Sequence, residues 1–316
     1  MSIIYDGSID KIVYKTVFGE TMEAIANADS NVVYLDADLM GSIGTTGFWK
    51  RNPKQAINVG IAEANMAGIA AGLSAAGKKP YLHTFGPFAS RRIYDQVFLS
   101  IAYAGNNARI FGSDPGVAAA FNGGTHMPFE DLALYRAIPH STVIEISDGA
   151  MLEALMWQVK DRSGLTYTRL TRKAYPTIYS KDHKFTIGKG EIIRKGTDAT
   201  IIACGLMVGE ALAAAEKLAT DDINVQVIDM FTIKPLDVDL VLEAAKTGII
   251  ITAENHNVIG GLGDAVASTL LEAGVAPKFK RIGIEESFGQ VGPQDFLQKH
   301  YGLTAENIEK TLRDIL

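Results

Sequence analysis

The chain is 316 residues long, with 47% hydrophobic residues, 21% charged residues and a net charge of −6 at neutral pH. This composition excludes a disordered or fibrous chain, and the acidic balance argues against binding to nucleic acid or to an anionic membrane surface. The apolar runs are too short to cross a bilayer and the N-terminus lacks a secretory pattern, so we expect a cytoplasmic protein of two domains.

Short β-branched runs alternate with longer helical patterns from the start of the chain. Four runs have the continuous apolar character of strands that are covered on both faces: residues 31–35, 56–59, 109–111 and 142–146. Helical patterns lie between and around them, at residues 11–28, 62–76, 91–104 and 150–160. This alternation predicts a parallel sheet with helices on both faces.

A second series of the same kind follows a polar, proline-bearing stretch at residues 173–189. Its strands are predicted at residues 199–204, 225–228, 248–252 and 279–282, and its helices at residues 208–218, 238–245 and 265–273. We therefore predict the α/β class, with parallel-sheet domains over residues 1–175 and 191–316 and a linker over 176–190. Cys204, the only cysteine, lies inside a predicted strand, and we expect a buried thiol there instead of a nucleophile.

The stretch from 58 to 80 contains a single acidic residue, Glu63, directly after a predicted strand and at the predicted start of a helix. The helix beyond it consists mostly of small residues, with Gly68 and Gly72 four apart on one face. Small residues allow another backbone to approach closely, so we expect this face to contact a partner. A carboxylate removed from water there favours proton sharing, although the helix dipole alone also favours a glutamate at this position.

Two further segments carry candidate functional side chains. Phe85 and Phe88 flank a Gly-Pro turn at the end of a predicted strand, where their rings can stack on a heteroaromatic ligand or simply join the core. The glycine- and alanine-rich loop over 113–131 has a length that is usually functional, and it carries one histidine, His126. That histidine is either a solvated side chain or a group that binds an oxyanion or donates a proton.

Together, these three segments resemble the C-terminal half of transketolase. The similarity is closest to the split transketolases of bacteria and archaea, in which that half is a separate chain. It extends over the C-terminal part through three segments: VIDMFTIKPLD at 227–237, ENHNVIGGLGDAVA at 254–267 and YGLTAENI at 301–308. The resemblance implies a thiamine-diphosphate pyrimidine-binding domain followed by a transketolase-type C-terminal domain.

The resemblance also implies roles for particular residues. Glu63 corresponds to the family's glutamate that hydrogen-bonds atom N1′ of the thiamine aminopyrimidine and activates the cofactor. Phe85 and Phe88 correspond to aromatic residues around the pyrimidine, and Arg91 completes the implied cofactor-binding set. His126 corresponds to a histidine that contacts the bound sugar, so Glu63 and His126 are the implied catalytic residues.

The remaining implied contacts concern the sugar substrate. Arg172 matches an arginine that binds the distal phosphate, as its forked guanidinium allows. Ser42 lies near a phosphate contact, and Lys15 replaces an arginine of the same site. Ser113 and Asn122 replace a histidine and an aspartate of ordinary transketolases, which leaves the donor sugar open and is compatible with a sulfonated or branched sugar.

The sequence contains no GDG followed some tens of residues later by paired asparagines, the signature that binds the metal and diphosphate in enzymes with this cofactor. The resemblance therefore implies that Mg²⁺ and the diphosphate are held by a separate N-terminal transketolase subunit, in an α2β2 heterotetramer. The implied reaction is transfer of a two-carbon ketol unit from an anionic ketose to an aldose.

Three alternatives remain open. They are the β subunit of a 2-oxo-acid dehydrogenase, a relative of deoxyxylulose-phosphate synthase, and a non-catalytic regulatory subunit. The glycine-rich loop that follows His256 resembles a nucleotide-binding loop, but one glycine cluster is weak support for that function. We interpret the loop and His256 as interface structure.

Overall fold

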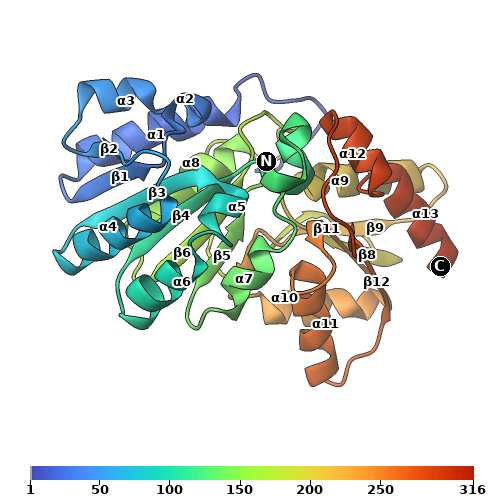
Figure 1. Ribbon diagram of the computed structural model, residues 1–316. Helices are drawn as coiled ribbons and strands as arrows, with labels where there is room; N and C mark the ends of the chain where they lie inside the picture. The colour runs from blue at the N-terminus through green and yellow to red at the C-terminus, as the bar shows by residue number, and fades with distance from the viewer. Residues whose placement is uncertain (1) are drawn as a thin grey trace.

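The computed structural model describes residues 2–316, which form two α/β units that lie side by side (Figure 1). The first unit contains a seven-stranded sheet with the order β10-β5-β6-β4-β3-β1-β2. Its strands are β1 (Val32–Asp36), β2 (Ala56–Asn58), β3 (Lys79–Phe85), β4 (Ala108–Ser113), β5 (Thr142–Glu145), β6 (Leu165–Leu170) and β10 (Thr232–Lys234). All neighbouring strands are parallel except β10, which pairs antiparallel with β5.

Helices cover both faces of this sheet, as the alternating pattern predicts. On one face, α1 (Tyr14–Ala28) packs beside α8 (Gly149–Gln158); on the other lie α4 (Glu63–Ala75), the π-helix Val97–Tyr103 and α7 (Asp131–Ala137). The shorter helices are α2 (Met40–Ile43), α3 (Thr46–Arg51), α5 (Gly86–Ala89) and α6 (Tyr94–Gln96), with 3₁₀ turns at Gly116–Asn122, Gly124–His126 and Val159–Asp161. The sheet therefore separates two hydrophobic clusters, and burial on both faces explains why its strands are continuously apolar.

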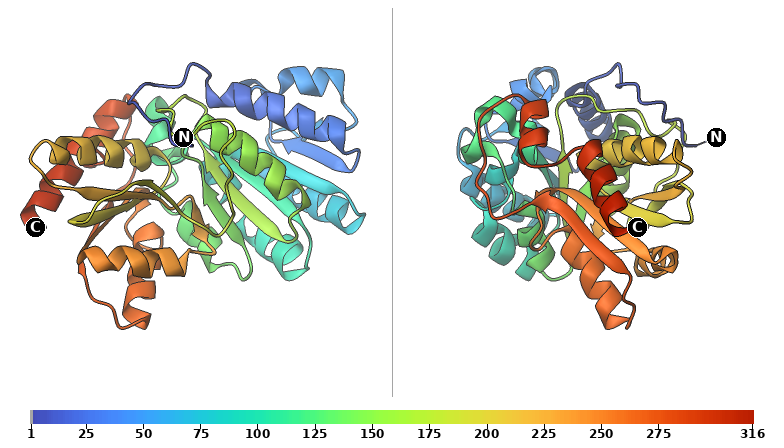
Figure 2. Two further views of the ribbon diagram at one scale, coloured as in Figure 1. Left: turned by 180° about the vertical axis from the view of Figure 1, so that it is seen from behind. Right: turned by 90° about the vertical axis from the view of Figure 1, so that its right-hand side faces the viewer.

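The second unit contains a five-stranded sheet with the order β12-β11-β8-β9-β7. Its strands are β7 (Glu191–Arg194), β8 (Ala199–Ala203), β9 (Val225–Asp229), β11 (Ile249–Asn257) and β12 (Lys278–Ile284). Its helices are α9 (Leu206–Ala219), α10 (Val238–Ala244), α11 (Leu262–Glu272), α12 (Gln294–His300) and α13 (Ala305–Ile315), with a 3₁₀ turn at Ala245–Thr247. Helices α9 and α13 lie on one face and α10 and α11 on the other (Figure 2).

The structure confirms two α/β units in series and corrects three details. Both sheets are mixed, because β10 and β7 each pair antiparallel. Strand β10 belongs to the second half of the chain but pairs only with β5 and forms an edge of the first sheet. The helix predicted over 91–104 begins at Tyr94 and continues as a π-helix, because residues 91–93 form a turn.

The stretch between the units is closely packed. Tyr179 is buried and donates its hydroxyl to Asp229 Oδ2 at 2.8 Å. The amides of Ile178 and Tyr179 both donate to Asp148 Oδ2, at 3.0 and 2.8 Å. The predicted linker is therefore anchored to both units, and its residues Ile178, Tyr179 and Phe185 are buried in the hydrophobic core. Cys204 is fully buried as expected.

No helix within residues 2–316 is long and apolar enough to cross a membrane.

Candidate active site

Glu63 is positioned by the turn that joins β2 to α4. Gly60 has a positive φ of 74°, which a glycine adopts without strain. The side chain of Asn58 accepts hydrogen bonds from the amides of Gly60 and Asp38, at 2.9 and 3.1 Å, and so joins the loops after β2 and β1. Glu63 then begins α4 with only 4% of its surface exposed. The predicted helix start and the burial of this carboxylate are both confirmed.

The carboxylate of Glu63 has a partner that the sequence did not identify. Arg92 Nη1 donates to Glu63 Oε1 at 2.9 Å, and the side chain of Arg92 is 46% exposed. The same guanidinium lies over the ring of Phe88, with Cζ 3.9 Å from the ring centre. Glu63 and Phe88, which come from α4 and α5, are thus brought to the same place.

The aromatic residues of this place form a cluster with His126. Phe85, at the end of β3, lies 6.3 Å from Phe88 between ring centres. The imidazole of His126 meets both rings edge to face, at 5.8 Å from Phe85 and 5.1 Å from Phe88. The structure therefore brings together Glu63, both phenylalanines and His126, as the sequence predicts.

His126 occupies an environment that favours its neutral form. Its Nδ1 lies 2.8 Å from Thr125 Oγ1. Partial burial, followed by the positive charges of Arg92 and Arg91, lowers the pKa of this imidazole. A neutral imidazole near neutral pH is able to accept a proton or donate one in a hydrogen bond.

Arg91 and Arg92 are adjacent but have different partners. Arg91 Nη1 donates to Glu130 Oε1 at 2.9 Å, and Nη2 donates to the carbonyl of Thr125 at 3.1 Å. Arg91 therefore supports the loop that carries His126. Arg92, which the sequence analysis did not select, contacts Glu63; only the conformation of the turn over 91–93 decides which arginine points there.

The residues predicted to bind an anion lie around the start of α1. Arg172 Nε donates to Asp114 Oδ2 at 2.7 Å, and its Cζ lies 5.0 Å from the ring centre of Phe85. The amide of Lys15 donates to the carbonyl of Arg172 at 3.1 Å, so these two cationic residues lie on adjacent backbone segments. Ser42 lies on α2, and the backbone of Gly44 that follows it packs against the backbone of Lys15. The Arg172 side chain thus connects this region with the aromatic cluster.

The structure corrects the expectation for Ser113. This serine is fully buried, and His83 Nε2 lies 3.0 Å from its Oγ. His83 Nδ1 in turn lies 2.7 Å from Asp36 Oδ2, and both of these side chains are also fully buried. Since Ser113 exposes no surface, it contacts a core network instead of a sugar. No local pattern around Ser113 predicts this contact, because the pairing of β3 with β4 is what brings His83 to it.

Asn122 is exposed at the end of the 3₁₀ turn Gly116–Asn122, on the loop of His126. Ala120 in the same turn has a positive φ of 50°, an uncommon conformation for a residue other than glycine. This position leaves Asn122 available to a ligand.

The end of β11, which carries His256, and the glycine-rich loop that follows it contact α7 of the first unit. His256 is fully buried, and its Nε2 accepts from the amide of Ala133 on α7 at 3.4 Å. Arg136 Nη1, also from α7, donates to the carbonyl of Gly261 at 2.9 Å. Glu254 Oε2 and Oε1 accept from the amides of Leu262 and Gly263 at the start of α11. The loop is therefore contact structure between the units, as we interpreted it.

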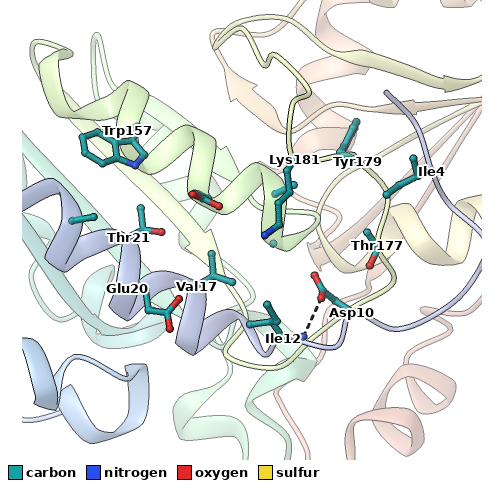
Figure 3. Close-up of a pocket in the computed structure, with 14 residues that line it drawn as sticks. Ile4, Asp10, Ile12, Val17, Glu20, Thr21, Trp157, Thr177, Tyr179 and Lys181 are labelled. Atoms are coloured by element: carbon teal, nitrogen blue, oxygen red, sulfur yellow. Dashed lines mark hydrogen bonds between the residues drawn. The ribbon is translucent and has the colours of Figure 1, made fainter. Parts of the chain in front are cut away.

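A separate pocket of about 420 Å³ lies between α1, α8 and the stretch between the units. Figure 3 shows Trp157 of α8, Glu20 of α1 and Lys181 around it, with Asp10 bonded to the amide of Ile12 at 3.0 Å. None of the predicted site residues lines this pocket. The candidate site is thus distinct from it.

The residues of the candidate site fit the pyrimidine part of thiamine diphosphate. To bind a planar nitrogen heterocycle of this kind, a site needs a carboxyl group at a ring nitrogen and an aromatic side chain against the ring face. Glu63 supplies the carboxyl group and Phe88 the aromatic ring, and the planar guanidinium of Arg92 contacts both in this structure. Among residues 2–316, no group of three or more His, Cys, Asp or Glu side chains is placed to hold a metal ion.

Comparison with protein families gives two matches that together span most of the chain. Residues 10–177 match the transketolase pyrimidine binding domain, and residues 188–308 match the transketolase C-terminal domain.

Individual proteins give the same result. The chain is 48% identical over 291 residues to the 6-deoxy-6-sulfo-D-fructose transketolase subunit SqwH of Clostridium sp. (strain MSTE9), covering 92% of this chain and 90% of that subunit. It is 36% identical over 302 residues to an apulose-4-phosphate transketolase subunit of Phocaeicola vulgatus, covering 95% of this chain and 96% of that subunit. A solved structure described as a split gene transketolase, inactive beta4 tetramer, superposes with a TM-score of 0.88 at 36% identity, covering 96% of this chain and 98% of that one.

Proposed function

The chain belongs to the transketolase family, and on this basis we propose that it is the pyrimidine-binding subunit of a split, thiamine-diphosphate-dependent transketolase. The complete enzyme transfers a two-carbon ketol unit from an anionic ketose to an aldose acceptor. The observation that carries the proposal is the convergence of Glu63, Phe88 and His126.

Each residue of this cluster has a task in the proposed reaction. Bound thiamine diphosphate supplies the carbon nucleophile and the electron sink that carbon–carbon cleavage requires. Glu63, buried at the start of α4, shares a proton with ring nitrogen N1′ of the pyrimidine, and Phe88 supports the face of that ring. His126 holds or moves a proton at a sugar oxygen, since its lowered pKa keeps the imidazole neutral.

Arg172, Lys15 and Ser42 are proposed to bind the charged end of the sugar. Arg172 extends from the start of α1 to the ring of Phe85, and Asp114 fixes the orientation of its guanidinium. Arginine matches the oxygens of phosphate and sulfonate groups with paired donors. The names of the two relatives support this proposal, because one refers to a sulfonated sugar and the other to a sugar phosphate.

We also propose that a separate subunit provides Mg²⁺ and the diphosphate site, in an α2β2 assembly. Large apolar side chains near the site support an interface there: Ile61 is 77% exposed, Phe121 71% and Phe288 96%. Gly68 and Gly72 on α4 have open space where a Cβ would lie, so another backbone is able to approach this helix closely.

Reconstitution with a candidate diphosphate-binding subunit, from the gene adjacent to that of this chain, tests the proposed function. Ketol transfer is measured with 6-deoxy-6-sulfofructose, fructose 6-phosphate and neutral fructose as donors. Transfer from at least one anionic donor at a much higher kcat/KM than from fructose is the expected result. Oxidation of 2-oxo acids without any ketol transfer would instead assign the chain to a dehydrogenase.

A further inference from the structure

Arg92 is the residue of the site to which the proposed function assigns no task. Its guanidinium donates to Glu63 Oε1 at 2.9 Å and lies 3.9 Å from the ring centre of Phe88. In the proposed function, Glu63 and Phe88 make the same two contacts with the pyrimidine ring of the cofactor. One planar group, carried by the chain itself, makes both of them.

We propose that Arg92 occupies the pyrimidine position in the free chain and is displaced when the cofactor binds. This inference rests on the proposed function, because it takes Glu63 and Phe88 as the pyrimidine contacts. The chemistry of the two groups supports it. A guanidinium is planar and delocalised, stacks on aromatic faces and donates in-plane N–H groups to a carboxylate, as an aminopyrimidine does when the shared proton is on N1′.

The burial of Glu63 gives a physical reason for such a substitute. The side chain of Glu63 is only 5% exposed, and a buried ionised carboxylate without a partner is strongly unfavourable. Arg92 supplies that partner while the cofactor is absent. The site therefore keeps its carboxylate oriented and its aromatic face covered before assembly.

The position of Arg92 allows it to leave. It lies in the turn over 91–93, between α5 and α6, and 46% of its side chain is exposed. Its neighbour Arg91 is held by Glu130 and by the carbonyl of Thr125. Among the described residues 2–316, the side chain of Arg92 donates a hydrogen bond only to Glu63. Solvent weakens this half-exposed ion pair.

The size of the effect follows from these contacts. A half-exposed ion pair and a half-exposed cation–π contact each shift an equilibrium by a few-fold. If Arg92 has left the site in only a minor fraction of molecules, the apparent association constant for the pyrimidine is the intrinsic one multiplied by that fraction. Arg92 is thus expected to weaken pyrimidine binding to the free chain by about tenfold.

The test measures binding of 4-amino-5-hydroxymethyl-2-methylpyrimidine to the complete chain, by calorimetry or ligand-observed NMR. Arg92→Ala is expected to tighten binding about tenfold relative to the unmodified chain, because the competing side chain is gone. Arg92→Lys keeps the charge but loses the flat face, so it is expected to give an intermediate affinity. Arg51→Ala, which removes an exposed arginine from its surface pair with Glu23, is the matched control and is expected to bind like the unmodified chain.

The gain in affinity must depend on Glu63. In the double variant Arg92→Ala with Glu63→Ala, it is expected to disappear; a gain that persists means that the probe binds elsewhere, and the inference fails. Circular dichroism checks that each variant is folded, and Arg92→Lys gives a second reading should Arg92→Ala unfold.

The outcome also separates this inference from the proposed function. If pyrimidine binding requires Glu63 but neither Arg92 variant tightens it, the inference is overturned and the proposed function stands. If thiamine diphosphate with Mg²⁺ fails to bind even when the partner subunit is present, the proposed function fails and the inference fails with it.

Discussion

Two clusters of arginine, carboxylate and imidazole groups in this molecule differ mainly in their exposure. At the contact between the units, Arg169 is fully buried and forms ion pairs with Asp131 Oδ2 and Glu145 Oε1, each at 2.9 Å. At the candidate site, Arg92 pairs with Glu63 at the same distance but is 46% exposed. The first cluster is enclosed by the chain itself, whereas the arginine of the second is half exposed to solvent.

This difference indicates which cluster stabilises the fold and which is available for chemistry. Arg169 also donates to the carbonyl of Asn255 at 3.0 Å, so its guanidinium joins elements from both units. Loss of one partner strongly destabilises a buried charge, because water cannot reach the charge to replace the lost interaction. The half-exposed arginine of the site can exchange its partner at little cost.

Neutralising Glu63 tests whether the half-exposed cluster takes part in the reaction. We expect Glu63→Gln to reduce ketol transfer by the reconstituted enzyme at least about a hundredfold, because an amide cannot share a proton as a carboxyl does. The melting temperature should change little, since the lost ion pair is half-exposed. Glu23→Gln, which breaks the surface pair with Arg51, is the matched control. Unchanged turnover in Glu63→Gln would contradict the assigned role.

Removing Arg169 tests whether the buried cluster stabilises the fold. We expect Arg169→Met to lower the free energy of unfolding by about 3–5 kcal/mol, because it leaves Asp131 and Glu145 buried without their cation. Urea denaturation measures this change. Arg51→Met, at the surface pair with Glu23, should cost less than about 1 kcal/mol. Equal losses in the two variants would show that burial does not distinguish the clusters.

A smaller effect is expected at the edge of the open cluster. Arg172→Ala should raise the KM for anionic donors about tenfold, because it removes a forked donor to the charged group. The KM for neutral sugars should stay nearly the same. Steady-state kinetics with matched anionic and neutral ketoses measures the difference, and an equal rise for both would count against an anion site.

The buried carboxyl group of Asp229 is expected to make the stability of the fold depend on pH. Burial raises the pKa of Asp229, whose Oδ2 accepts from Tyr179, to about 8. The unfolded chain ionises this carboxyl near its ordinary pKa of about 4, so the stability it confers is lost as the pH rises from there towards 8. We expect Asp229→Asn to remove at least about 1 kcal/mol of the stability difference between pH 5 and pH 8. Identical pH profiles for both proteins would exclude this contribution.

Much of the closed framework could be predicted from the sequence, because strand and helix periodicity reports burial directly. The strand-to-helix transition before Glu63 and the strand β8, which ends one residue before the buried Cys204, are examples. Strands β6, β7 and β10 were not predicted. Strand β10 has only three residues and pairs with β5, a strand much earlier in the chain.

The open site was less predictable, because its contacts depend on side-chain direction. Glu63, Phe88 and His126 were found through their local patterns and the family resemblance. Arg92 was missed because nothing local to the pair Arg91–Arg92 tells which of the two points towards Glu63. Ser113 was assigned to the sugar through the family resemblance, and no local pattern reveals its partner His83, which comes from a strand 30 positions away.

This chain, in the function we propose, provides only the pyrimidine half of a cofactor site. Calorimetric titration of thiamine diphosphate with Mg²⁺ into the chain alone, and into its mixture with the candidate diphosphate-binding subunit, tests this most directly. We predict tight binding in the mixture and no comparably tight binding to the chain alone. Tight binding to the chain alone would contradict the proposal, because it would require a diphosphate site within this chain.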